Sequence, residues 1–373
     1  MQSWGKLAFT LNHGQPTKDF KQTMITRRRL LQTFCALPFA ASFPARGMAQ
    51  DLPAFAQLKT GYAQRLKKFL AAGELPYIDL ESSCNSGKVD IASIAQSMDK
   101  LNIGMMALSA DIGEGKFSQG VRFDNLSARL IAAYPQHFIP VGNGGQAPAT
   151  TEAPDEFLDA QQAAARDKKI MLLGEFEFRH YPSPRQAKNS STDRDVTIAI
   201  DSPLGHRLFS ISEQTGMLFQ IHYEVEDALL APLEKMLQQY PKARVMWCHL
   251  AQIRYIERAS IYTPAYVDSL LKRFPNLYFD TAFGDAASIY PLSNQRHARI
   301  WTTFGGIKDE WRDLIVAHPR RFLSALDLGQ DRLHRLAEYD QRHRAFLQRL
   351  PAETRHDIAY RSAWLLLFGE EFA

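Results

Sequence analysis

Short apolar runs alternate along this chain with longer segments that have helical spacing. Buried parallel strands read as apolar runs, and regular alternation of strands with helices is typical of α/β proteins. No strand-to-helix junction carries Gly-x-Gly-x-x-Gly or a phosphate-binding loop, so the sequence does not indicate a dinucleotide-binding or phosphate-binding fold. We predict eight strands at residues 75–81, 103–109, 138–142, 170–176, 217–222, 244–249, 277–281 and 322–327.

The intervening segments are expected to be helical, and the polar stretch 180–201, with two prolines and a Ser-Ser pair, is expected to be a loop. Eight strands favour a closed (β/α)8 barrel over an open sheet, with C-terminal helices after the last strand. The predicted helices are residues 55–72, 89–101, 126–134, 155–167, 204–215, 226–240, 264–274, 309–318, 331–350 and 353–368.

The excess of positive charge in the chain lies in its first 49 residues. They hold seven basic residues and one acidic residue. Of the 44 basic and 40 acidic residues in the whole chain, 37 and 39 therefore remain, which changes a net charge of +4 to −2. The remainder has no basic stripe, so we expect no nucleic-acid partner.

The same segment has the layout of a signal peptide. Residues 26–31 read Thr-Arg-Arg-Arg-Leu-Leu, an apolar stretch follows at 33–43, and small residues flank the end at Gly47 and Ala49. This pattern predicts a twin-arginine signal, an interaction with that export machinery, and a periplasmic or secreted mature protein. An ordinary secretory signal or an uncleaved anchor is the alternative. The apolar stretch is too short for a stable membrane anchor.

This interpretation divides the chain into two segments. Residues 1–49 are expected to form an N-terminal extension and signal peptide, and residues 50–373 a single barrel domain. Met24 lies three residues before Arg27, so the start codon at Met1 or Met24 stays open.

Several predicted strands end in side chains that bind metals. His222 and His249 end two consecutive strands, and Asp327 ends the last one. The C-terminal ends of barrel strands point into the active site, so these three side chains are expected to share one site. Neutral imidazole suits zinc, iron and manganese alike.

At this point the chain resembles the amidohydrolase superfamily, in particular its amidohydrolase-related branch of hydrolases and nonoxidative decarboxylases. The resemblance covers residues 75–369, and its order and spacing are more specific than any single motif. Its motifs are residues 76–80 (Pro-Tyr-Ile-Asp-Leu), 173–175 (Leu-Gly-Glu), 219–222 (Phe-Gln-Ile-His), 246–249 (Met-Trp-Cys-His), 276–281 (Asn-Leu-Tyr-Phe-Asp-Thr), 321–327 (Arg-Phe-Leu-Ser-Ala-Leu-Asp) and 358–363 (Ile-Ala-Tyr-Arg-Ser-Ala).

The resemblance implies roles for the strand-end residues. His222 would bind a divalent transition metal, and Asp327 would bind it or accept a proton. His249 would bind metal or polarise the substrate. The implied activity is hydrolysis, or C–C bond cleavage, of a small organic acid, ester, amide or lactone through metal-activated water.

The first strand departs from the family pattern. The family's His-x-His reads Glu81-Ser82-Ser83 here, and a serine hydroxyl is a poor ligand. Some decarboxylases of this branch carry Glu-x-His, so Glu81 has precedent as a ligand. The alternative is that Glu81 pairs with an arginine at the barrel mouth. The resulting ligand set favours zinc, manganese or iron.

Two further residues complete the candidate site. Glu175 is expected to orient a ligand histidine, because such histidines usually donate to a carboxylate. Arg179 is a candidate for holding a substrate carboxylate, although an ordinary solvated arginine is the simpler interpretation.

The degenerate first strand leaves other functions open. One is a metal-free descendant of the family that binds a ligand or partner without catalysis. Another is metal-free acid–base catalysis by His249 with Asp327.

Overall fold

The computed structural model describes residues 53–84, 89–112, 114–329 and 332–373. The predicted signal peptide and both candidate start residues lie outside the described residues. Those that are described belong to one compact unit, which spans Gln50–Ala373.

The strands form three sheets. The central sheet has the order β10-β7-β6-β5-β3-β4, and all its pairings are parallel except that of β3 with β4. Strands β1 and β2 pair in parallel, and β8 and β9 form an antiparallel pair. The strands are β1 (Ile78–Cys84), β2 (Met105–Ala110), β3 (Glu175–His180), β4 (Val196–Thr197), β5 (Leu218–Tyr223), β6 (Arg244–Trp247), β7 (Leu277–Asp280), β8 (Ile289–Tyr290), β9 (Gln295–Arg296) and β10 (Phe322–Leu323).

Parallel bridges outside the named strands connect the two parallel sheets. Strand β2 bridges to Phe138, and Val141 in the same segment bridges to Leu172, just before β3. On the other side of β1, Ser82 bridges to Leu328, which follows β10. A backbone hydrogen bond of 3.0 Å from Asp327 to the carbonyl of Glu81 lies beside that bridge.

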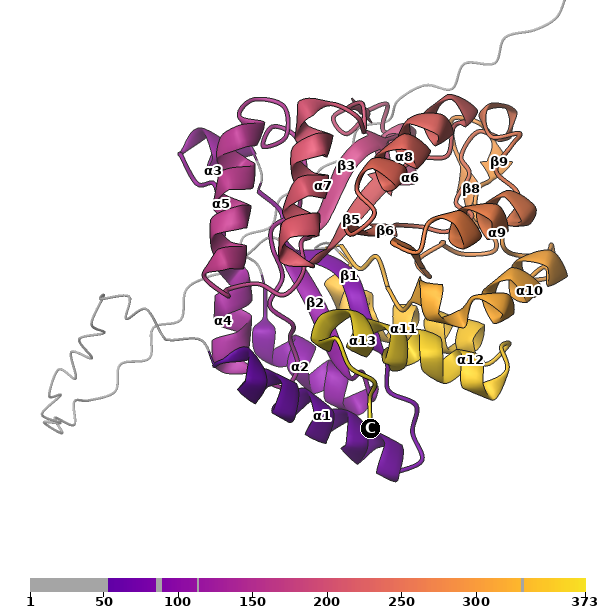
Figure 1. The fold of residues 1–373 in the computed structure, drawn as a ribbon. Helices are drawn as coiled ribbons and strands as arrows, with labels where there is room; N and C mark the ends of the chain where they lie inside the picture. The colour runs from indigo at the N-terminus through magenta and orange to yellow at the C-terminus, as the bar shows by residue number, and fades with distance from the viewer. Residues whose placement is uncertain (1–52, 85–88, 113, 330–331) are drawn as a thin grey trace, which may run out of the picture. The chain divides into compact units, whose positions relative to one another are not determined.

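Helices surround the strands (Figure 1). Three short 3₁₀ helices and one π-helical turn, Asp357–Arg361, complete the described elements. The α-helices are α1 (Phe55–Ala71), α2 (Ile91–Lys100), α3 (Glu114–Ser118), α4 (Leu126–Ala133), α5 (Pro154–Arg166), α6 (Pro184–Lys188), α7 (Pro203–Thr215), α8 (Asp227–Gln239), α9 (Pro264–Arg273), α10 (Asp309–Ala317), α11 (Leu336–Leu347), α12 (Ala352–His356) and α13 (Ser362–Phe368).

Local sequence explains where several helices begin. The side chains of Asp90, Ser202 and Thr263 accept hydrogen bonds from backbone N–H groups in the first turns of α2, α7 and α9. Such caps satisfy N–H groups that have no partner inside the helix. Helices α5, α7 and α9 also begin with proline, which suits the first turn.

The alternating α/β architecture predicted from the sequence is confirmed, but several boundaries differ. The fourth strand begins at Glu175 rather than at residue 170, and residues 138–142 form single bridges rather than a regular strand. The predicted loop 180–201 contains α6 and β4, because β4 pairs with the end of β3. The predicted last helix is divided into α12, the π turn and α13.

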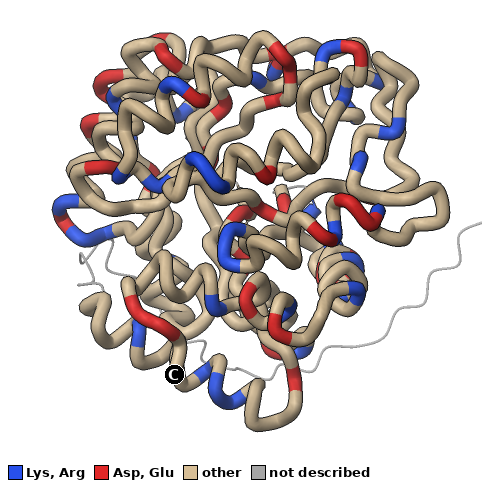
Figure 2. Tube along the Cα trace, turned by 45° about the vertical axis from the view of Figure 1, so that its right-hand side comes forward, with Lys and Arg blue, Asp and Glu red and all other residues tan. Residues whose placement is uncertain are grey.

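Basic and acidic residues are interspersed along the trace (Figure 2). Within the described ranges, no helix has the length and apolar character needed to cross a membrane.

Candidate metal centre

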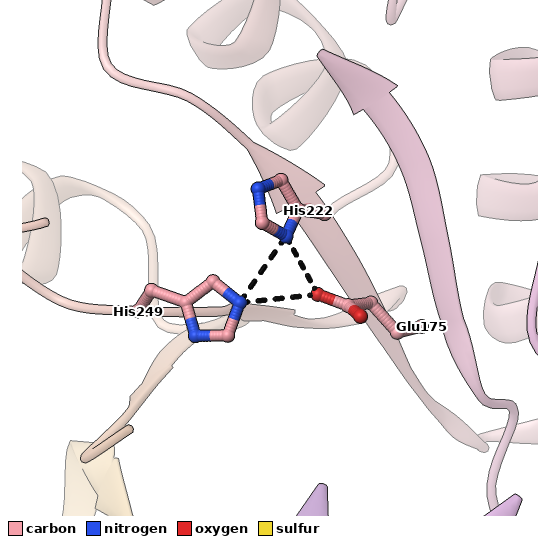
Figure 3. Close-up of side chains that lie close together, drawn as sticks. All are labelled: Glu175, His222 and His249. Atoms are coloured by element: carbon pink, nitrogen blue, oxygen red, sulfur yellow. Dashed lines mark hydrogen bonds and ion pairs between the residues drawn. The ribbon is translucent and has the colours of Figure 1, made fainter. Parts of the chain in front are cut away.

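Three side chains from neighbouring parallel strands converge on one point (Figure 3). Glu175 begins β3, His222 lies in β5, and His249 follows the end of β6. Glu175 Oε1 lies 3.0 Å from His222 Nδ1 and 3.4 Å from His249 Nε2. The two imidazole nitrogens are 3.2 Å apart.

The backbone around His249 fixes the direction of its ring. Its φ of 64° lies in the left-handed region, which is uncommon for a residue with a side chain. Its N–H donates to Asp280 Oδ1 at 2.7 Å, and its Nδ1 lies 3.0 Å from the carbonyl oxygen of Ala282. Because a carbonyl only accepts, Nδ1 carries the proton and leaves Nε2 facing Glu175 and His222.

A second group of ligand-type side chains shares the same histidine. Glu81, His249 and Asp280 each offer an atom within 4.8 Å of the others, as do Glu175, His222 and His249. Glu81 and Asp280 are buried, and within the described part of the chain Glu81 Oε2 and Asp280 Oδ2 have no hydrogen-bond partner. Buried carboxylate oxygens without partners are costly, whereas a cation between them would satisfy both.

The pKa values of Glu81 and His249 are both displaced upward. Burial, together with the charges of Asp327 and Glu175, raises the pKa of Glu81 well above its usual value. Burial alone would lower the pKa of His249, but its hydrogen bond to Glu175 and the charge of Asp280 raise it well above normal. The site therefore holds protons that a divalent cation would displace, since metal ligands must be deprotonated.

The far side of His222 is also occupied by an acid. Glu224 Oε1 lies 3.2 Å from His222 Nε2 and 3.0 Å from Arg254 Nε, and all three side chains are buried. Burial opposes ionisation of Glu224, but the charge of Arg254 and the contact with His222 lower its pKa to about 2. The ring of His180 packs against His222, with centroids 4.2 Å apart.

The structure brings most of the sequence-predicted residues together, but not all. Glu81, His222 and His249 lie in the two ligand groups, and Glu175 contacts both histidines. Asp327 belongs to neither group. Its backbone is left-handed at φ 48°, and its carboxylate lies 3.1 Å from Arg332 Nη2.

Arg179 makes its contacts within the protein. Its Nε donates to Glu226 and its Nη1 to Asp195, both at 2.8 Å, and its guanidinium lies over the ring of Tyr181. These contacts tie the end of β3 to the loop that follows it and to Glu226, which precedes α8. Its role toward a substrate carboxylate stays a prediction.

Two site residues were missed from the sequence, Asp280 and Glu224. Asp280 follows the apolar run Leu277–Phe279 and so ends its strand as His222 and His249 do, a signal that could have revealed it. Glu224 lies in the loop after β5 and becomes visible only through its contacts with His222 and Arg254.

Little free space adjoins the two histidines. A void of about 10 Å³ borders His222, Trp247, His249 and Gln252. That volume suits one water molecule or one ion, not an organic molecule.

No protein-family model matches this chain, and no curated protein sequence matches it. Solved structures do resemble its fold. A 2,6-dihydroxybenzoate decarboxylase from Rhizobium has 11% identity, covers 78% of this chain and 98% of its own, and gives a TM-score of 0.48. A dihydroxybenzoic acid decarboxylase from a Polaromonas species, with bound manganese, has 12% identity, covers 78% and 96%, and gives 0.46.

A dihydroorotase from Campylobacter jejuni has 8% identity, covers 79% of this chain and 84% of its own, and gives a TM-score of 0.48. Two of these three neighbours are thus decarboxylases and the third is a dihydroorotase.

Proposed function

We propose that this chain is a metal-dependent enzyme of the amidohydrolase superfamily, a hydrolase or a C–C lyase. Its substrate would be a small organic acid, ester, amide or lactone. One observation carries the proposal. Three carboxylates and two imidazoles from different strands converge in the protein interior, and two of the carboxylate oxygens there have no partner among the described residues.

The proposed architecture is a closed (β/α)8 barrel. In it, residues 137–145 would be the third strand, between β2 and the segment leading into β3, and residues 322–328 would be the eighth, between β7 and β1. The parallel bridges Met106–Phe138, Val141–Leu172 and Ser82–Leu328 support this closure. In such a barrel the side chains at the strand ends share one catalytic face.

The donor set fits a transition metal. Glu175, His222 and His249 would hold one zinc, manganese or iron ion, and Glu81 and Asp280, which form a second group with His249, would add carboxylate ligands. When bound, such an ion polarises a carbonyl group and lowers the pKa of water.

The residues around the ligands have separate tasks. Glu224 and the carbonyl of Ala282 each contact one histidine and fix its orientation. Asp327, paired with Arg332 and partly exposed, is the carboxylate placed to move a proton to or from a substrate.

The proposed location is the periplasm or the exterior of the cell. Its support is the twin-arginine pattern at residues 27–28 and the apolar stretch after it. The proposed partners are the export machinery and a small-molecule substrate.

The metal content of the purified protein tests the proposal. We expect about one equivalent of zinc, manganese or iron when the protein is purified without chelators and measured by elemental mass spectrometry. His249→Ala should remove most of the metal, because His249 belongs to both ligand groups. His206→Gln, on α7, is the matched control and should retain it.

Two outcomes would contradict the metal centre. One is wild-type protein with no bound metal and no uptake on reconstitution. The other is His249→Ala that keeps its metal while remaining folded. Either result would favour the metal-free descendant that binds a ligand without metal chemistry.

A further inference from the structure

A second cavity lies beside the short helix α6 and the β8 strand. Its volume is about 470 Å³, which is within the range of pockets that bind small molecules. The void beside His222 and His249 holds about 10 Å³ by comparison. The larger cavity is lined by Pro184, Lys188, Ala287, Ser288, Ile289, Pro291 and His297.

His297 is the buried polar side chain in this lining. It is 5% exposed, and its Nδ1 has no hydrogen-bond partner among the described residues. Burial and the nearby charge of Arg254 lower the pKa of His297 to about 4. Its ring is therefore neutral near pH 7 and can offer one donor and one acceptor to a ligand.

The backbone places His297 next to the metal centre. Its carbonyl accepts a hydrogen bond of 2.8 Å from the N–H of Ile253, and the neighbouring pair Gln252–Ala298 forms an antiparallel bridge. Gln252 also borders the void at His249. A Cβ on Gly284 would lie 3.7 Å from His297 Nε2 and 3.8 Å from Gln252 Oε1, so the two polar groups face the same glycine.

The rest of the lining indicates the kind of ligand. Lys188 is exposed at the end of α6, and among the described residues no acidic side chain forms an ion pair with it. Pro184, Pro291 and Ile289 provide apolar walls, and Ile289 is 51% exposed. An exposed isoleucine beside an unpaired lysine suits a ligand with an apolar body and one negative charge.

We propose that this cavity is the substrate-recognition site and takes a small organic anion, whose charged group pairs with Lys188 while His297 hydrogen-bonds its polar end toward His249. The orientation of the ligand's polar end toward His249 rests on the proposed function. The binding of the ligand rests on the cavity alone.

The probes are 4-hydroxyphenylacetate, which has a carboxylate for Lys188 and a hydroxyl group for His297, and its neutral counterpart 4-hydroxyphenylacetamide. Their binding is measured by calorimetric titration of the intact protein. Lys188→Met keeps the length of the side chain and removes its charge. We expect it to weaken 4-hydroxyphenylacetate binding about five-fold, because an ion pair of this exposure contributes about 1 kcal/mol. The amide should bind the variant and the wild type equally.

Lys235→Met, at an exposed lysine of α8, is the matched control and should change neither affinity. His297→Gln should weaken the binding of both probes while Lys188→Met discriminates between them. Because His297 is buried, the variant must first be shown to be folded by a melting temperature equal to that of the wild type. If His297→Gln lowers the melting temperature, His297→Asn replaces it.

Equal 4-hydroxyphenylacetate affinity in wild type and Lys188→Met would overturn the inference, as would the absence of saturable binding to the wild type. Titration of metal-loaded and chelator-treated protein separates the two proposals. A protein that binds no metal but keeps the Lys188 effect contradicts only the metal centre. A protein that binds metal without the Lys188 effect contradicts only the recognition site.

Discussion

His222 lies between two acids, and this arrangement decides how it can act. Its Nδ1 faces Glu175 at 3.0 Å and its Nε2 faces Glu224 at 3.2 Å. An imidazole that gives one nitrogen to a metal commonly donates its other N–H to a carboxylate. Since Glu175 and His249 lie on the Nδ1 side, the Nε2 side is left for Glu224 as the orienting partner.

Glu224→Gln tests the stabilising part of this arrangement. The change would leave the guanidinium of Arg254 buried beside a neutral amide, and the loss of one member of a buried pair costs about 3 kcal/mol. We expect the free energy of unfolding, measured by urea denaturation, to fall by about that amount.

A control variant and a double-mutant cycle accompany Glu224→Gln. Glu234→Gln removes the acid from a more exposed pair with Arg273 and should cost at most about 1 kcal/mol. The double variant Glu224→Gln/Arg254→Gln should lose less stability than the two single variants added together. Strict additivity would mean that the pair does not interact.

At this scale the sequence predicted which strand-end side chains cluster better than it predicted the residues that contact them. His222, His249 and Glu81 are strand-end residues, and the structure places them in the two ligand groups. Glu224 and Arg254 could not be predicted, because their contact joins two loops across the interior and leaves no local periodicity. Asp280 also ends an apolar run, so the strand-end pattern applies to it as well.

At the scale of the elements, helices were predicted closely and strands less so. Helices α5, α7 and α9 begin within one residue of the predicted positions, because proline and capping side chains mark those starts locally. The bounds of β3 depend on pairing with β4 and β5, which are distant in sequence. An apolar run therefore predicts that a strand exists more reliably than where it begins.

Gly205 in the first turn of α7 shows a packing constraint that helix propensity does not reveal. A Cβ there would overlap the carbonyl oxygen of Ile200 and lie 2.8 Å from its carbonyl carbon. Gly205→Ala should therefore destabilise the protein by about 1–3 kcal/mol, the usual cost of overpacking, although alanine favours a helix. A lower melting temperature in calorimetry would show this.

Gly115→Ala is the comparison for this change. Gly115 lies in α3, and nothing lies within 4 Å of the added atom. We expect its melting temperature to be unchanged or slightly raised. An equal loss of stability in both variants would show that the contact with Ile200 is not the cause.

At the scale of the whole molecule, α11 joins the beginning and end of the parallel strand series. Arg344 Nη1 donates to the carbonyl of Leu75 at 2.8 Å, and Tyr77 donates to Asp340 at 3.1 Å. His343 Nε2 contacts Ser324 Oγ, after β10, at 2.9 Å. The sequence predicted this helix, but contacts across more than two hundred residues could not be predicted from a local pattern.

His343 should make the stability of the folded chain depend on pH. Burial and the charge of Arg344 lower its pKa to about 3 in the folded state, whereas an unfolded histidine has a pKa of about 6.5. Between these values the unfolded chain binds the extra proton, so the free energy of unfolding should fall as pH decreases from 6.5, by up to about 1.4 kcal/mol per pH unit. In urea denaturation at several pH values, the free energy of unfolding should therefore decrease less steeply with falling pH for His343→Gln than for the wild type. His206→Gln, on α7, is the control and should keep the wild-type slope. An unchanged slope in His343→Gln would contradict the assignment, because His343 on α11 would then not be buried in its neutral form against Ser324.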